Sequence, residues 1–233
     1  LLQPGTKEGT SSSKASREHT VASPVPGLTE IAGGKLTTYR VMAKDAVDFA
    51  LGDRAEALPS VTHVTPLWGA EGLEATERRM RLLADEHGWT DWQISHLLHR
   101  YGSGVADLVD QISARPDLAQ PLRHAPAYLR AEIHYAATHE GVLHLEDVML
   151  LRTRLDYETA DAGRASSVEI AESVGEVLGW DDERREAEIA SWAARADAED
   201  AAAREQSEEA AVAARAAVPD IAPMVAQHGA ATA

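Results

Sequence analysis

Apolar residues recur at three- and four-residue spacing along most of the chain, and this period predicts helices. Gly, Pro and charged residues interrupt the pattern at intervals and mark the connections between helices. The expected helices cover residues 36–50, 72–87, 91–98, 105–112, 127–139, 145–155, 167–178 and 182–192. A chain with this pattern should be mostly α.

Several of these helices carry capping signals at their ends. Thr90 with Gln93, and Ser166 with Glu169, have the spacing of a capping box, in which each partner binds the other's backbone amide. Asp181 precedes the last helix and is expected to cap it, whereas the helix before that one should end at a glycine, Gly179.

Near the amino end the pattern favours two short strands. Residues 19–22 and 28–31 are rich in β-forming residues, and the prolines and glycine between them predict a hairpin. Gly33 and Gly34 then break the chain before the helix expected at 36–50. The predicted local order is therefore strand, Gly-Gly turn and helix.

Composition changes twice along the chain and suggests where its parts begin. Residues 53–70 are expected to be a linker, because glycine and proline recur there. From residue 196 to 233, alanine and acidic residues dominate, so this part should be a solvated helix or a disordered tail. The parts between these boundaries are a short α/β segment, 1–52, and an all-helical domain, 71–195.

The overall charge and residue content exclude several classes of protein. A formal net charge of -16 disfavours binding to nucleic acid. No segment approaches the ~20 apolar residues that a membrane helix needs. The absence of cysteine excludes disulfides and thiolate metal sites, and it is consistent with a cytoplasmic location.

Histidine and arginine clusters were considered as sites. His134, His139 and His144 recur every five residues, which does not place them on one helical face, so no metal site is predicted. Arg152-Thr153-Arg154 could form a basic patch for an acidic partner together with Arg123 and Arg130, or it could serve packing.

The most informative segment is the octet Gly33-Gly34-Lys35-Leu36-Thr37-Thr38-Tyr39-Arg40. Paired glycines permit a tight turn and close approach of a ligand to the backbone. A following helix would present unpaired amides and its positive dipole end beside Lys35 and Thr37. The octet therefore suits an anionic ligand, although a simple turn and cap would have the same spacing. It is not a phosphate-binding P-loop, and the chain holds no G-x-G-x-x-G fingerprint.

This octet, preceded by Ser16-Arg17-Glu18-His19, resembles FAD-dependent glycerol-3-phosphate dehydrogenases. Downstream, Ala131–Ala136, Leu145–Val148 and Arg152–Leu155 are similar to the helical C-terminal domain of the same family. The resemblance extends over roughly residues 1–195. It implies a short remnant of a FAD-dependent oxidoreductase domain at 1–52, followed by the helical domain at 71–195.

The resemblance also implies roles for individual residues. Gly33, Gly34, Lys35, Leu36 and Thr37 would bind the flavin of FAD. Lys35 and Arg17 would bind the substrate, sn-glycerol 3-phosphate, which is oxidised to dihydroxyacetone phosphate while electrons pass to quinone. No catalytic residue is assigned within this chain. Without the glycine fingerprint, the chain alone should neither retain FAD nor turn over substrate.

Partners and location follow from the same resemblance. A separate N-terminal FAD-binding half and a homodimer are both compatible with it, as is peripheral attachment to the inner face of the cell membrane. Two alternatives stay open. One is a glycerol-3-phosphate oxidase, which passes electrons to oxygen. The other is a non-catalytic helical interaction module, which would present an exposed apolar face along residues 36–50.

Overall fold

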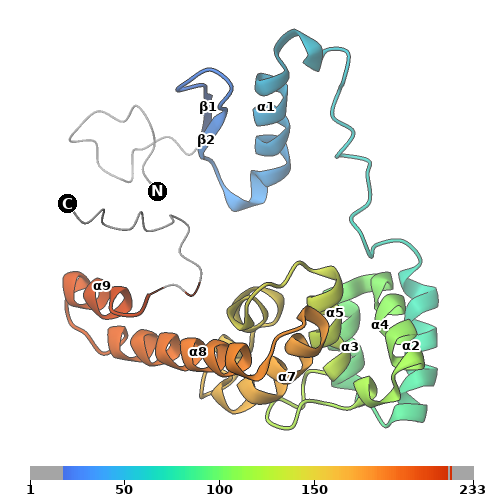
Figure 1. Cartoon of the computed structure of the whole chain (residues 1–233). Coiled ribbons are helices and arrows are strands. Elements are labelled where there is room, and N and C mark those ends of the chain that lie inside the picture. Colours follow the sequence, from blue (N-terminus) through green and yellow to red (C-terminus); the bar gives the residue numbers. More distant parts are fainter. Residues whose placement is uncertain (1–17, 220, 222–233) are drawn as a thin grey trace. The chain divides into compact units, whose positions relative to one another are not determined.

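The computed structural model describes residues 18–219 and 221. The chain divides into two compact units, and the boundary in the sequence falls between Leu67 and Trp68 (Figure 1). Unit 1 contains a two-stranded sheet and one long helix, and unit 2 is helical. The mostly α fold predicted from the sequence is confirmed.

Unit 1 begins with the predicted hairpin. Strands β1, His19–Ala22, and β2, Glu30–Gly33, pair antiparallel, with Val21 opposite Ile31. The second strand begins two residues later than the sequence predicted, because Leu28 closes the turn by donating its amide to the Val25 carbonyl.

Helix α1, Tyr39–Leu51, follows and contacts both strands. It does not begin directly after Gly34, as its spacing predicted, because Leu36–Thr38 first form a 3₁₀ turn. None of the described residues of unit 1, 18–67, is buried. This unit therefore lacks a core of its own within the described part of the chain.

Unit 2 contains the remaining helices. In chain order they are α2 Leu73–His87, α3 Asp91–Tyr101, α4 Val105–Ala114, α5 Arg130–His139, a π-helix Asp147–Arg152, α6 Leu155–Glu158, α7 Ser167–Leu178, α8 Asp182–Ala202 and α9 Glu208–Ala216. Short 3₁₀ turns join several of them.

Two apolar clusters form the interior of unit 2, and α5 belongs to both. Ala131 and Tyr135 of α5 pack with α2, α3 and α4 in the first cluster. Ile133 and Ala136, on another side of the same helix, pack with α7 and α8 in the second. Figure 1 shows α5 between these two groups of helices. The side chains of α5 are buried on nearly every side of the helix, and this burial explains the weak amphipathic pattern of its sequence.

The predicted caps have different outcomes. Thr90 and Gln93 form a capping box at the start of α3, and the Asp181 side chain accepts the Arg184 amide at 2.8 Å. Ser166 does not cap α7, contrary to the prediction. The Glu169 carboxylate, its expected partner, instead binds Arg130 and the backbone amide of Arg123.

The helix predicted at 145–155 is also different in the structure. A π-helix ends at Arg152, and α6 begins at Leu155 after a break. Thr153 causes this break, because both its amide and its hydroxyl donate to the carbonyl of Val148, at 2.8 and 2.6 Å. The hydroxyl thus adds a second hydrogen bond to the carbonyl that already accepts the last backbone bond of the π-helix.

The change in composition near residue 196 does not coincide with a helix end. Helix α8 continues through Ala196, which is buried, to Ala202, and α9 packs against it. An ion pair between Arg215 of α9 and Glu199 of α8, at 2.8 Å, joins the two helices. Of the two forms expected for this part, helix is the one present as far as Ala216.

Candidate functional site

The Gly-Gly turn of unit 1 has the backbone conformation that glycine permits. Gly33 and Gly34 have φ angles of 83° and 79°, in the left-handed region. A Cβ atom at Gly34 would lie 2.5 Å from the Met42 sulfur and 3.3 Å from the Cβ of His19. Glycine is therefore required here both by the backbone angle and by the close packing of α1.

Polar contacts hold this turn against the helix. Nε2 of His19, on β1, lies 2.9 Å from a carboxylate oxygen of Asp45 on α1. The Thr38 hydroxyl donates to the Lys35 carbonyl at 2.9 Å, and the Lys35 amide donates back to that hydroxyl at 3.3 Å. This exchange tightens the chain after Gly34 into the 3₁₀ turn.

The candidate binding residues on the turn face solvent. Lys35, Leu36 and Thr37 are all exposed, and 90% of the Leu36 surface is accessible. Amides in the first turn of a helix have no internal acceptor, so those of the 3₁₀ turn are available to a ligand. The residues that follow Gly34 are thus accessible to a ligand, whereas Met42 and His19 fill the space beside Gly34 itself. Arg17 lies outside the described residues.

One side of α1 carries exposed apolar residues. Tyr39 and Val47 are 60% and 56% exposed, and Ala43 and Ala50 lie between and beyond them at helical spacing. With Leu36, these residues form a stripe along one side of the helix. This is the exposed apolar face that was expected of an interaction module.

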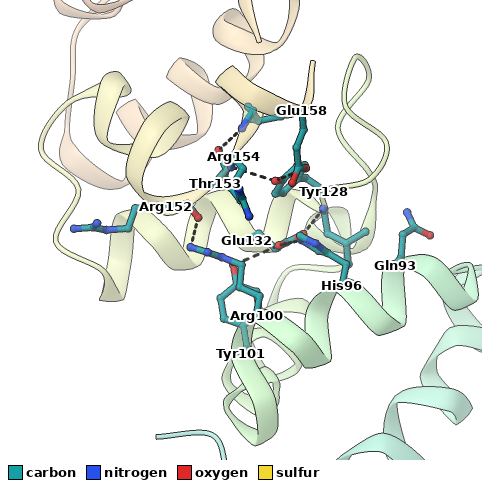
Figure 2. A network of polar contacts seen from close by, with 12 residues as sticks. Gln93, His96, Arg100, Tyr101, Tyr128, Glu132, Arg152, Thr153, Arg154 and Glu158 are labelled. Carbon is teal, nitrogen blue, oxygen red and sulfur yellow. Dashed lines mark hydrogen bonds and ion pairs between the residues drawn. The ribbon is translucent and has the colours of Figure 1, made fainter. Parts of the chain in front are cut away.

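A second group of polar side chains surrounds Glu132 in unit 2 (Figure 2). Glu132 lies on α5 and is 1% exposed. One carboxylate oxygen accepts from Nε2 of His96 at 2.8 Å and from the Tyr101 hydroxyl at 3.4 Å. The other accepts from the Leu129 amide at 2.9 Å, so Glu132 caps its own helix while fixing two side chains of α3.

Tyr128 is the centre of a second set of contacts in Figure 2. Its hydroxyl donates to Glu158 at 2.9 Å and accepts from the Arg154 amide at 3.1 Å. Burial and the neighbouring carboxylates raise the pKa of both Tyr101 and Tyr128 well above the ordinary value. Both hydroxyls therefore remain protonated and act as donors.

An open cleft of about 460 Å³ lies beside this network, between α3 and the residues that follow the π-helix. No sequence motif indicates this group. His96 and Glu132 are 36 positions apart, so local spacing does not pair them. Within the described residues, no group of three His, Cys, Asp or Glu side chains could hold a metal ion.

The helical part of the chain matches a known family. Residues 60–185 match the model for the C-terminal domain of alpha-glycerophosphate oxidase. This match covers more than half of the chain, so the chain belongs to that family. Among the helices that the structure describes, none combines the length and apolar character needed to cross a membrane.

Relatives of this chain carry the name glycerol-3-phosphate dehydrogenase. One from Mycobacterium leprae is 44% identical over 193 residues, which cover 82% of this chain and 33% of that protein. A mitochondrial one from Arabidopsis thaliana is 33% identical over 195 residues, 77% of this chain and 30% of its own length. A mitochondrial one from Bos taurus is 32% identical over 179 residues, which cover 75% of this chain and 24% of that protein.

The resemblance predicted from the octet and its flanks is therefore confirmed. The chain spans about a third of the length of the mycobacterial relatives that it matches.

Proposed function

We propose that this chain is the carboxy-terminal part of a flavin-dependent glycerol-3-phosphate dehydrogenase. The observation that carries the proposal is the Gly33-Gly34 turn, whose left-handed backbone leads directly into exposed Lys35, Leu36 and Thr37. The identity of 44% to a glycerol-3-phosphate dehydrogenase over 193 residues supports the same assignment.

The residues of the turn have separate roles in this proposal. Gly33 and Gly34 would shape the turn that holds the flavin, and the backbone amides at Leu36 and Thr37 would donate hydrogen bonds to it. When bound, FAD would supply the two-electron redox chemistry for oxidation of sn-glycerol 3-phosphate at C2. Lys35 and Arg17 bind the substrate, and an arginine fork is well shaped for its phosphate.

The activity further requires a polypeptide that this sequence does not contain. The chain holds no G-x-G-x-x-G fingerprint for the pyrophosphate, and its described N-terminal unit has no buried residue. The apolar stripe of α1 supports docking onto another polypeptide, which is the N-terminal FAD-binding half in this proposal. Residues 1–52 are then a part of the FAD and substrate domain, 53–70 a linker, 71–195 the helical domain and 196–233 a tail.

In the intact enzyme of this proposal, electrons pass to quinone. The enzyme is cytoplasmic and attaches peripherally to the inner face of the cell membrane. A homodimer is compatible with this arrangement. The stripe on α1 equally favours the second candidate, a non-catalytic interaction module, because apolar residues exposed along a helix need a partner whether or not a cofactor is present.

Reconstitution tests this proposal. The purified chain alone should retain no yellow flavin. Mixed with the first two-thirds of the Mycobacterium leprae relative and FAD, it should retain flavin and reduce a quinone analogue when sn-glycerol 3-phosphate is added. Lys35→Ala should lower this activity, whereas Lys14→Ala should not. Peroxide formation in place of quinone reduction would indicate an oxidase, and binding without any turnover would indicate an interaction module.

A further inference from the structure

The two arginine side chains of the basic segment Arg152-Thr153-Arg154 lie in different environments. Nε of Arg152 donates to the Glu140 carbonyl at 2.7 Å, so this side chain is held against α5. The Arg152 carbonyl in turn accepts a hydrogen bond from Arg100. Arg154 is exposed, and its guanidinium forms no hydrogen bond or ion pair with any residue in the part of the chain that the structure describes.

The guanidinium of Arg154, whose charge also acts on the Asp156 carboxyl, lines the cleft of about 460 Å³ beside α3. Two side chains of α3 that line the same cleft, His99 and Arg100, can each donate a hydrogen bond, whereas His96 donates its Nε2 hydrogen to Glu132. Arg123 and Arg130, the other members of the basic patch considered from the sequence, lie at a different depression, where Arg130 pairs with Glu169 at 2.8 Å. The five residues considered from the sequence therefore do not form one basic patch. Arg154 lies instead at a cleft with residues of α3.

Three carboxylates at or behind this cleft each contact a neighbouring side chain. Glu158 is the one acidic residue among those lining it, and an oxygen of Glu158 accepts from Tyr128 at 2.9 Å. Behind the lining, Glu132 fixes His96 at 2.8 Å, and Glu140 lies 3.7 Å from Arg100. Two permanent cations and two histidines thus face the cleft, in a chain whose net charge is -16.

An exposed aromatic ring forms another side of the cleft. The indole of Trp92 stacks on His96, with ring centroids 5.3 Å apart and planes inclined by 6°. Trp92 nevertheless remains 54% exposed, which is unusual for a tryptophan within a helical domain. Because Glu132 fixes His96, this stacked pair is a preorganised flat surface at the edge of the cleft.

We propose that this cleft binds a small phosphorylated metabolite with a planar group near its phosphate. Arg154 contacts the phosphate with its guanidinium fork, and His99 and Arg100 add donors. Trp92 stacks on the planar group. The volume lies within the range of small-molecule sites. All these residues belong to unit 2, so the inference is independent of the Gly33-Gly34 turn.

Titration of the full-length chain with phenyl phosphate tests the proposal. Calorimetry at constant ionic strength measures the affinity, and tryptophan fluorescence reports contact with the ring. We expect saturable binding of phenyl phosphate, weaker binding of inorganic phosphate and no binding of phenol. Arg154→Gln should weaken phenyl phosphate binding about tenfold or more, because a charged hydrogen bond is lost.

Two further variants make the result specific. Trp92→Phe should reduce the advantage of phenyl phosphate over inorganic phosphate, while leaving the affinity for inorganic phosphate unchanged. Arg204→Gln removes an exposed arginine beyond the end of α8 and should change neither affinity.

Equal affinity in the wild type and in Arg154→Gln, with folding verified by circular dichroism, would overturn the proposal. So would binding of polyglutamate without binding of phenyl phosphate, which would identify the cleft as a docking face for an acidic protein.

Discussion

The two units of this chain differ most in how they bury apolar residues. Unit 2 holds two clusters in which residues such as Ile133, Leu145 and Ile170 are 0% exposed. Unit 1 has a well-defined turn and helix, yet none of its described residues is buried. A regular backbone therefore does not by itself indicate an independent fold, because stability depends on the apolar surface removed from water. By this measure unit 2 has an apolar core, whereas the described residues of unit 1 have none.

Matched truncations should give the largest contrast between the units. Ile133→Ala, within the core of unit 2, should lower the free energy of unfolding by about 2–5 kcal/mol, because it removes buried methyl groups and leaves a cavity. Val47→Ala, on the exposed stripe of α1, should change it by less than about 0.5 kcal/mol. Urea unfolding followed by circular dichroism measures both. Similar losses at the two sites would contradict the comparison.

A smaller loss is expected from the buried carboxylate of unit 2. Glu132→Gln keeps the shape of the side chain but removes the charge that pairs with His96, and it offers one acceptor oxygen in place of two. The expected cost is about 1–3 kcal/mol in the free energy of unfolding. Glu205→Gln, at an exposed position, is the control and should have no effect. A neutral result for Glu132→Gln would show that the network adds little to stability.

The turn in unit 1 should respond locally. Gly34→Ala forces a left-handed residue against Met42, whereas Gly27→Ala has the same backbone penalty but no atom within 4 Å of the new Cβ. The backbone part alone costs roughly 1 kcal/mol. Hydrogen exchange should accelerate in α1 more for Gly34→Ala than for Gly27→Ala, while amides of α5 are unaffected. Equal acceleration in both variants would mean that Met42 moves aside freely.

The smallest effect is a pH dependence in unit 2. Burial, with the charge of Arg115, lowers the pKa of His134, so the folded state binds this proton less tightly than the unfolded chain. The contribution of His134 to stability is therefore present above its ordinary pKa of about 6.5 and is lost as the pH falls below that value.

Because His134 is only half-buried, this loss should be well below about 1 kcal/mol. The difference in unfolding free energy between the wild type and His134→Gln should shrink between about pH 7.5 and 5.5. His63→Gln, at an exposed position of unit 1, should show no such change.

The parts of this fold that follow from local chemistry could be predicted from the sequence. Thr90 and Asp181 cap their helices through their own side chains, and paired glycines produce the turn at Gly34. Features that depend on distant residues could not. Glu169, for example, is diverted from Ser166 to Arg130, 39 positions away. The π-helix was missed for another reason, because the bonds of Thr153 to the Val148 carbonyl are local but apolar periodicity does not reveal them.

The same distinction applies to the candidate sites. The residues of the Gly33–Thr37 turn are contiguous, so their grouping was visible in the sequence. The residues lining the cleft come from α3, from Tyr128 before α5 and from the segment after the π-helix, and only the packing of unit 2 brings them together.

Helix α5 has a consequence for how unit 2 comes apart. Its ten residues, Arg130–His139, contribute side chains to both apolar clusters, so neither cluster can lose its packing while the other keeps this helix in place. Heating should therefore melt the two halves of unit 2 in a single cooperative transition, with coincident signals from Trp89 in one half and Trp192 in the other.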